Sequence, residues 1–360
     1  MASSAPDQGW GRVRGRFPGP SPVKILIVKL SSLGDVVHSM PAVQDIRRAL
    51  PQAQVDWVVE RGFAPLVQRC EGVGRVVACA LRRWRKAPLS AETRVQWRAF
   101  RDALRAEPYD AVIDLQGLTK SALVARVARL TAGGKRFALA NRTEGSAYEA
   151  PTRWVADVAL RIEPHVHAVQ RSRELCALAL GYRLPASLRF GLGAQGRPAE
   201  RDRAPVTPAA ADGRTVVLVH GSSRDDKGWP QPHWEQLGLR LIADGLSVGL
   251  PHGSDAELVR SRSLAARLGP RAEVWPRLEL GALADRFAAS AGVVGVDSGL
   301  SHIAVALDLP HVQIYNFDTA WRTGPVASAG SGRPRQLSVF SQPTPSVDAV
   351  WQAWQQVRAA

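Results

Sequence analysis

The sequence predicts an α/β protein with two domains, each built on a parallel β-sheet. Short apolar runs alternate with longer segments of helical spacing, and this alternation restarts in the second half of the chain. A segment rich in Gly, Pro, Ala and charged residues, 191–213, separates the two halves. Strands that alternate with helices favour parallel sheets joined by right-handed crossovers.

Both halves contain the elements that such a fold requires. The run at 23–29 is almost continuously apolar, as expected for a strand buried on both faces. In the first half, strands are predicted at 23–29, 55–60 and 109–117, and helices at 36–50, 93–107 and 118–130. In the second half, strands are predicted at 214–221, 246–253, 292–297 and 311–316, and helices at 232–245, 280–291, 299–309 and 346–360. Because ligands of open α/β sheets bind beyond the carboxyl ends of the strands, the loops there are the candidate sites.

Composition and charge narrow the class of protein. Apolar residues make up 45% of the 360 residues, and no apolar stretch approaches the ~20 residues that span a bilayer. The three cysteines show no metal-ligand spacing and fit a reducing cytoplasm. The net charge of +15 favours an acidic partner, such as a phosphorylated substrate or an anionic membrane surface. Nucleic acid competes as a partner, but no RNA- or DNA-binding module is recognisable.

The segments outside the two halves have their own composition. The first 22 residues are rich in Pro, Gly and Arg and lack the apolar region of a signal peptide, so we expect a disordered basic arm. The expected organisation is an arm at 1–22, a first domain at 23–190, a linker at 191–213, a second domain at 214–340 and a terminal segment at 341–360.

The loop after the first strand joins two serines, a glycine and a carboxylate within Ser31–Asp35. Gly34 suits a close approach of the backbone to a ligand. Asp35 lies where a helix is predicted to begin, so it can act simply as a carboxylate that faces the helix dipole. That interpretation leaves the hydroxyls and the glycine unexplained, and a catalytic role for Asp35 stays open beside it.

A second polar loop, 219–230, follows the first strand of the second half. Ser222, Ser223 and Lys227 can hold phosphate oxygens, although a polar loop that happens to be basic is the simpler interpretation. The adjacent Asp225 and Asp226 are weak evidence for a metal site, because cationic residues flank them.

A third loop carries Asp297 at a strand end, with Ser298 and Gly299 at the start of the next helix. Asp297 or Ser298 could cap that helix, or the free N–H groups beside the glycine could receive a pyrophosphate. His302, on the first turn, faces either the same cleft or the core. Glu257 lies early in another helix, where a carboxylate can bond ribose hydroxyls.

A basic strip follows the short apolar run at 75–79. Arg82, Arg83, Arg85 and Lys86 surround Trp84. A charge run is usually a solvated face, but this one emerges at the predicted ligand edge, where arginine forks bind carboxylates and phosphates.

These segments together resemble the bacterial lipopolysaccharide heptosyltransferases from about residue 23 to the C-terminus. The matching pieces, in the same order and spacing, are ILIVKLSSLGDVVHSMPAV, VDWVVERGFA, RRWRKA, YDAVIDLQGLTKSAL, RDDKGWP, LPHG and VDSGLSHIAVALD. The piece RRWRKA favours the heptosyltransferase I type over the heptosyltransferase II type.

The resemblance implies a GT-B-type fold, in which two Rossmann-like domains face each other across a cleft and the C-terminal helix packs back on the first domain. It implies inverting transfer of L-glycero-D-manno-heptose from ADP-heptose to a Kdo hydroxyl of Kdo-lipid A. No metal or other cofactor is expected, since ADP-heptose is a substrate. The implied location is cytoplasmic and peripheral, on the anionic cytoplasmic face of the inner membrane, with no nucleic acid as partner.

The resemblance also implies roles for individual residues. Asp35 matches the general base, and Lys227 matches the residue that holds the donor phosphates. The other matching donor-site residues are Ser222, Ser223, Glu257, Asp297, Ser298, Gly299, Leu300 and His302. The matching acceptor-site residues are Ser32, Gly34, Arg82, Arg83, Arg85, Lys86 and Lys120.

Some positions depart from the family pattern. His252 stands where tryptophan is common, which leaves its packing role open, and residues 130–165 match poorly. The alternatives are heptosyltransferase II or another GT-B nucleotide-sugar transferase and, from a different class, a non-catalytic basic lipid-binding protein. The intact Asp35 and Lys227 argue against the last of these.

Overall fold

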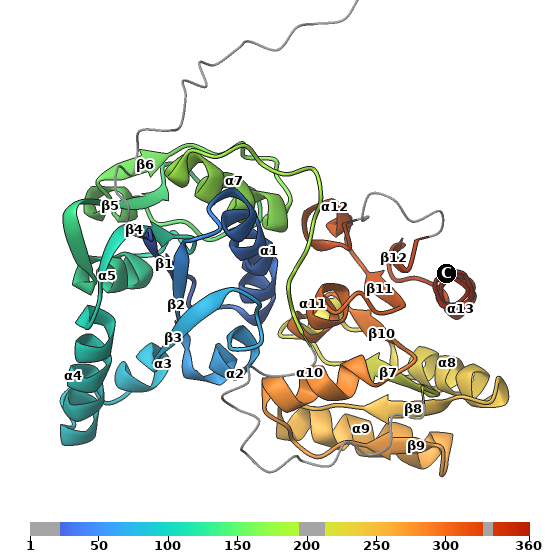
Figure 1. Ribbon diagram of the computed structural model, residues 1–360. Helices are drawn as coiled ribbons and strands as arrows, with labels where there is room; N and C mark the ends of the chain where they lie inside the picture. Colours follow the sequence, from blue (N-terminus) through green and yellow to red (C-terminus); the bar gives the residue numbers. More distant parts are fainter. Residues whose placement is uncertain (1–21, 194–212, 327–333) are drawn as a thin grey trace, which may run out of the picture.

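Two six-stranded parallel sheets form the framework of the protein (Figure 1). The computed structural model describes residues 22–193, 213–326 and 334–360. The strand orders are β3-β2-β1-β4-β5-β6 and β12-β11-β10-β7-β8-β9, so both halves have the same doubly wound topology. This confirms the predicted α/β class with two Rossmann-like domains.

The first sheet begins with the predicted apolar strand. Its strands are β1 (Lys24–Val28), β2 (Gln54–Glu60), β3 (Val73–Cys79), β4 (Pro108–Asp114), β5 (Arg129–Leu139) and β6 (Val158–Leu160). The helices are α1 (Leu33–Ala49), α2 (Ala64–Val67), α3 (Leu81–Trp84), α4 (Ala91–Arg105), α5 (Thr119–Val127), α6 (Thr152–Val155) and α7 (Ala168–Leu180), with a 3₁₀ turn η1 at Arg61–Phe63.

The second sheet repeats this plan. Its strands are β7 (Thr215–Val219), β8 (Ser247–Leu250), β9 (Ala272–Val274), β10 (Gly292–Val296), β11 (His311–Tyr315) and β12 (Gln336–Phe340). The helices are α8 (Gln231–Ala243), α9 (Asp255–Leu268), α10 (Leu280–Ala288), α11 (Gly299–Ala306), α12 (Ala320–Thr323) and α13 (Val347–Arg358), with a 3₁₀ turn η3 at Asp225–Lys227.

Alternate strand residues enter two apolar layers in each domain. In β1, Ile25 and Ile27 pack with α1 and α7, whereas Leu26 and Val28 face the layer that contains α4 and α5. Burial on both faces explains why this strand reads as one apolar run. The inner layers of the two domains merge into one cluster, in which residues of α1 and α11 both take part.

The C-terminal helix corrects one expectation. Instead of crossing back to the first domain, α13 covers the outer face of the second sheet, against β11, β12 and α8 (Figure 1). Val350, Trp354 and Val357 recur at helical spacing and fill the apolar layer that contains Val312 and Ile314. The physical reason is local: β11 and β12 need a helical cover on that face, and α13 follows β12 directly.

Contacts between the domains lie on the facing helices. Arg69, after α2, bonds Asp285 of α10, with Nη2 and Oδ2 2.6 Å apart. The short α12 reaches the first domain, where the Trp321 ring stacks on His165 with centroids 3.8 Å apart. Gly324 O lies 3.0 Å from His167 Nε2. These contacts fix which strand ends face each other across the boundary.

The predicted domain limits stay predictions. The arm at 1–22 and the linker at 191–213 fall almost entirely outside the described residues. Among the helices of the described ranges, none combines the length and the apolarity needed to cross a membrane.

Candidate active site

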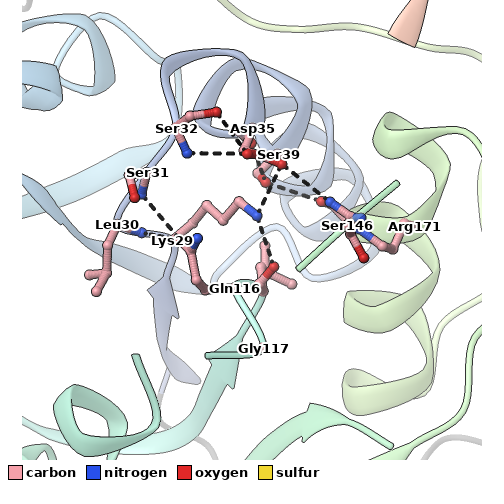
Figure 2. A network of polar contacts seen from close by, with 12 residues as sticks. Lys29, Leu30, Ser31, Ser32, Asp35, Ser39, Gln116, Gly117, Ser146 and Arg171 are labelled. Carbon is pink, nitrogen blue, oxygen red and sulfur yellow. Dashed lines mark hydrogen bonds and ion pairs between the residues drawn. The ribbon is translucent and has the colours of Figure 1, made fainter. Parts of the chain in front are cut away.

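Asp35 lies on the first turn of α1, directly beyond the end of β1 (Figure 2). Its Oδ2 accepts hydrogen bonds from Ser32 N at 3.1 Å and from Ser32 Oγ at 2.8 Å. Ser32 is the N-cap residue, so the helix start holds the carboxylate in one orientation. The Asp35 side chain remains 34% exposed, which leaves it accessible to a substrate.

Two buried cations flank the other oxygen of this carboxylate. Lys29 Nζ lies 3.5 Å and Arg171 Nη2 3.3 Å from Asp35 Oδ1 (Figure 2). Burial opposes ionisation of Asp35, but Lys29, Arg171 and the Ser32 hydroxyl outweigh it and hold the pKa of Asp35 well below its usual range. The carboxylate is therefore an anion throughout the neutral range.

Residues that follow β4 hold the loop between β1 and α1 in place. Gln116 Oε1 accepts from Leu30 N at 3.0 Å and Ser31 N at 3.1 Å, and the predicted acceptor residue Lys120 reaches Ser31 Oγ at 3.4 Å. Burial raises the pKa of Asp114, beneath this loop, to about 6. The loop is thus tied to β4 through side chains rather than through strand pairing.

On the second domain, Lys227 and Asp297 form the central pair. Lys227 Nζ, at the end of η3, lies 2.6 Å from Asp297 Oδ2, beyond β10. Gln313 and Thr323 donate to Asp297 Oδ1 at 3.4 Å each. Although burial opposes it, bonding to His302 and Lys227 lowers the pKa of Asp297 well below its usual range. Lys227, the predicted phosphate-binding cation, therefore lies in the candidate site with the ionised carboxylate of Asp297 beside it.

The starts of α1 and α11 meet at the domain boundary. A Cβ on Gly34 would lie 2.7 Å from His302 Cδ2, and one on Gly299 would lie 2.8 Å from Leu33 Cβ. His302 is buried, with Nε2 3.5 Å from Asp297 Oδ1, and its ring centroid lies 4.2 Å from that of His38 in α1. The two candidate half-sites are thus in contact through glycines and imidazoles.

The remaining predicted donor residues surround the helix starts of the second domain. Ser298 is the N-cap residue of α11, but its buried Oγ makes no capping hydrogen bond and has no partner in the described part of the chain; Leu300 follows in the first turn. Glu257 Oε2 accepts from Gly253 N at 2.6 Å, and its Oε1 would lie only 2.6 Å from a Cβ on Gly221. Ser222 and Ser223 follow Gly221, so the loops after β7 and β8 lie side by side.

The structure also places three residues whose role the sequence leaves open, His252, Asp225 and Asp226. His252 is partly buried, and its Nδ1 has no partner among the described residues. Asp226 pairs with Arg224, and Asp225 is exposed beside it.

The basic strip lies beyond β3, two strands from β1. Trp84 is its anchor: the indole is buried against Trp97 and Phe100, and its Nε1 donates to Gln96 Oε1 at 2.9 Å. Arg83 pairs with Glu92. Arg82, Arg85 and Lys86 are exposed, so three of the four predicted cations face solvent without an ion pair among the described residues.

Sequence reasoning missed the two cations beside Asp35. Lys29 ends an apolar strand and Arg171 lies in the apolar face of α7, 136 residues from Asp35. A charged residue in an otherwise apolar face was the available signal, since buried charges require partners. Gln313 and Thr323 were also missed, because nothing in the local sequence pairs them with Asp297, 16 and 26 residues away.

These observations define the class of protein. Two doubly wound domains place an ionised carboxylate at a helix start on one side of their boundary and a lysine-bearing loop beside a second helix start on the other. This arrangement is that of a GT-B-type glycosyltransferase. The chain belongs to glycosyltransferase family 9, the heptosyltransferases, whose family model matches residues 97–334.

The similarity to individual relatives extends over most of the chain. Lipopolysaccharide heptosyltransferase 1 of Escherichia coli K12 is 40% identical over 298 residues, covering 81% of this chain and 88% of the relative. Lipopolysaccharide heptosyltransferase 2 of the same strain is 26% identical over 307 residues, covering 81% and 82%. The type 1 relative is thus clearly the more similar of the two, which confirms the prediction from the RRWRKA segment.

Solved structures agree with this placement. E. coli heptosyltransferase WaaC with ADP is similar with a TM-score of 0.79 and 35% identity, covering 93% of this chain and all of that chain. The same enzyme with ADP-2-deoxy-2-fluoro heptose gives a TM-score of 0.74 and 36% identity, covering 92% and 98%. The protein is therefore a heptosyltransferase whose relatives build lipopolysaccharide.

Proposed function

We propose that this protein transfers L-glycero-D-manno-heptose from ADP-heptose to a Kdo hydroxyl of Kdo-lipid A, with inversion at the anomeric carbon. The observation that carries the proposal is the ionised Asp35 at the start of α1, which meets the start of α11 across the domain boundary, where Lys227 pairs with Asp297. The similar solved enzyme binds ADP and a fluorinated ADP-heptose, which supports the donor.

Asp35 is the proposed general base. As the Kdo oxygen forms its bond to the anomeric carbon of heptose, the hydroxyl proton passes to Asp35. The bond between that carbon and the ADP oxygen breaks on the opposite face, and ADP leaves with its electron pair. Attack and departure on opposite faces require base and diphosphate on opposite sides of the sugar, which the two domains supply.

Lys227 is the proposed diphosphate ligand. Its ammonium has three donors, and Asp297 occupies one of them, which leaves donors for phosphate oxygens. Free N–H groups at the start of α11, next to Gly299, add a positive potential for the same oxygens. Negative charge that grows on ADP is then stabilised by groups already in place, and the proposal uses no metal ion. Glu257 and Ser222 complete the donor side.

The acceptor lies on the side of the first domain in this proposal. The exposed Arg82, Arg85 and Lys86 offer cations for the Kdo carboxylates and lipid A phosphates, and Lys120 lies nearer to the base. An acceptor with a lipid anchor requires the enzyme to work at the anionic inner face of the membrane, as a peripheral protein.

The decisive experiment assays the purified protein with ADP-heptose and Kdo-lipid A, with and without EDTA. We expect transfer in both conditions, and loss of transfer in Asp35→Asn with the affinity for ADP-heptose nearly unchanged. Asp308→Asn, which alters an exposed carboxylate of the second domain, is the matched control and should transfer normally.

Two results would overturn the proposal. Turnover with a UDP-sugar but not with ADP-heptose would exclude the donor. Wild-type rates in Asp35→Asn would remove Asp35 as the base.

A further inference from the structure

Four arginines form a stripe along one side of α4. Arg94, Arg98, Arg101 and Arg105 follow the spacing i, i+4, i+7 and i+11, which places them on one flank of a helix over about 16 Å. All four are exposed. Phe100 and Leu104, about a third of a turn around α4 from the stripe, are buried in the outer apolar layer of the first domain, so the stripe lies on an exposed flank of the helix.

The fold makes little use of these charges. The side chains of Arg94 and Arg98 have no hydrogen bond or ion pair within the described residues. Arg101 pairs only with the adjacent, exposed Asp102, and Arg105 donates to Val127 O at 3.3 Å. Residues 81–105 contain eight cationic and two acidic side chains. Like charges held this close repel one another, so an external anion is the missing partner.

Exposed apolar side chains accompany the stripe. Leu89, just before α4, is 85% exposed, and Val95, next to Arg94, is 63% exposed. Leu123 of the neighbouring α5 is 58% exposed. A basic helix that only faces water gains nothing from large exposed apolar side chains. Cations mixed with protruding apolar groups fit the interface of an anionic bilayer, where phosphates and acyl chains are both present.

The position of α4 suits such a partner. Figure 1 shows α4 and α3 at the outer edge of the first domain, on the side away from the second domain. The stripe starts beside the basic strip Arg82–Lys86, which leads toward the strand ends that carry Asp35. A surface that touches α4 would therefore lie next to the acceptor side without covering the donor side.

We propose that the α4 stripe docks the protein on a bilayer that contains anionic phospholipid, with Leu89 and Val95 entering the headgroup region. This docking surface rests on the proposed function, because it places the site beside an acceptor that stays anchored in the same bilayer. The stripe itself takes no part in the chemistry, so docking and transfer can be measured separately.

The test is sedimentation of the full chain with vesicles of phosphatidylethanolamine and phosphatidylglycerol, at low and at 0.5 M salt. One cation near an anionic surface typically strengthens binding about fivefold, so Arg94→Gln/Arg98→Gln should bind about tenfold more weakly or worse. Arg262→Gln/Arg267→Gln on α9 removes two equally exposed charges from the other domain, and it should bind within about twofold of the wild type. High salt should abolish the difference.

Transfer assays separate this proposal from the proposed function. The Arg94→Gln/Arg98→Gln variant should transfer heptose normally to a Kdo acceptor with a short, soluble lipid, and slowly to the same headgroup embedded in anionic vesicles. Equal losses of vesicle binding in the two double variants, or none in either, would overturn the docking surface. Equal binding to vesicles of phosphatidylcholine alone would do the same. Absence of transfer by the wild type would count against the proposed function only.

Discussion

At the scale of single residues, the surroundings of Asp35 support the proposed base over a carboxylate that only caps a helix. A carboxylate at a helix start gains about 0.3–1 kcal/mol from the helix dipole, which is less than one pKa unit. The buried guanidinium of Arg171, which stays protonated, and the ammonium of Lys29 act at 3.3 and 3.5 Å. The cations, more than the helix start, hold the pKa of Asp35 low. A cap alone does not require them.

The pH dependence of the reaction should report on Arg171. In Arg171→Gln the pKa of Asp35 rises, so the base becomes protonated at a higher pH. The acidic limb of kcat/KM should then move to higher pH, while Arg171→Lys, which retains the charge, should move it less. The measurement is kcat/KM from pH 3 to pH 9, with the activity checked for recovery after each low-pH exposure, and superimposable acidic limbs in all three proteins would contradict the assignment.

Lys227 should affect both binding and rate. Lys227→Met removes the proposed diphosphate cation and leaves Asp297 buried without this ion pair. We expect kcat to fall about 10²–10³-fold and the KM for ADP-heptose to rise, because charge on departing ADP is no longer stabilised. Steady-state kinetics with ADP-heptose as the varied substrate measures both effects. Lys227→Arg should restore part of the rate, and an unchanged donor KM in Lys227→Met would refute the role.

At the scale of elements, α1 and α11 meet start to start, and two glycines permit it. Gly34 faces His302, and Gly299 faces Leu33, at distances that leave no room for a Cβ. The approach also keeps His302 against Asp297. Gly34, in the first turn of α1, therefore permits contact between the domains, and the contact with a ligand that the sequence suggested stays a prediction.

The approach of these helices can be tested at Gly34. In Gly34→Ala the new methyl group would displace His302, loosen its contact with Asp297 and move the two helix starts apart. We expect kcat to fall several-fold while the melting temperature changes little. Gly62→Ala, where a Cβ meets nothing within 4 Å, is the control and should behave as the wild type. Equal kinetics in the two variants would show that this contact is unimportant for transfer.

The elements also show what sequence reasoning can reach. Strands such as β1 and β10 were predictable because a parallel strand buried on both faces is apolar throughout. The placement of α13 was not predictable from the sequence. Trp351 and Trp354 signal that the helix needs an apolar surface, but the outer faces of both domains offer one, and helical spacing does not distinguish them.

The residues of the candidate site also divide into those that sequence reasoning finds and those that it misses. Asp35, Lys227 and Asp297 each follow a strand, and the rule that ligands bind at strand ends finds them. Lys29 and Arg171 are recognised only once the fold brings them to Asp35. Roles that depend on pairing across the fold leave almost no local pattern.

At the scale of the whole molecule, the buried histidines link stability to pH. Burial lowers the pKa of His167, His220 and His311 to about 4, and that of His38 also lies well below its usual range. In the unfolded chain these groups titrate near ~6.5, so below that pH the unfolded state binds more protons. Burial raises the pKa of Asp114, Asp45 and Glu60, and these three carboxyls act in the opposite sense, but the four histidines outnumber them.

Thermal stability should therefore fall as the solution is acidified from pH 7 toward pH 4. The melting temperature, followed by circular dichroism at constant ionic strength, should be nearly constant from pH 7 to pH 8 and decrease by several degrees by pH 5. A melting temperature that is flat between pH 7 and pH 5 would show that the histidines titrate normally in the folded protein.

The position of α13 has a consequence for the way this chain could be cut and recombined. Because β1–β6 precede β7–β12 and α13 stays on the second sheet, the described elements pass from one domain to the other only once. A break between Gly193 and Gly213 would yield two polypeptides, each with a whole sheet and helices on both its faces. Only the noncovalent boundary, with its glycines, its stacked Trp321 and its Arg69–Asp285 pair, would then hold donor half and acceptor half together. If the proposed donor and acceptor sides are correct, donor and acceptor specificity are carried by separable halves, and halves from two relatives could assemble into one transferase.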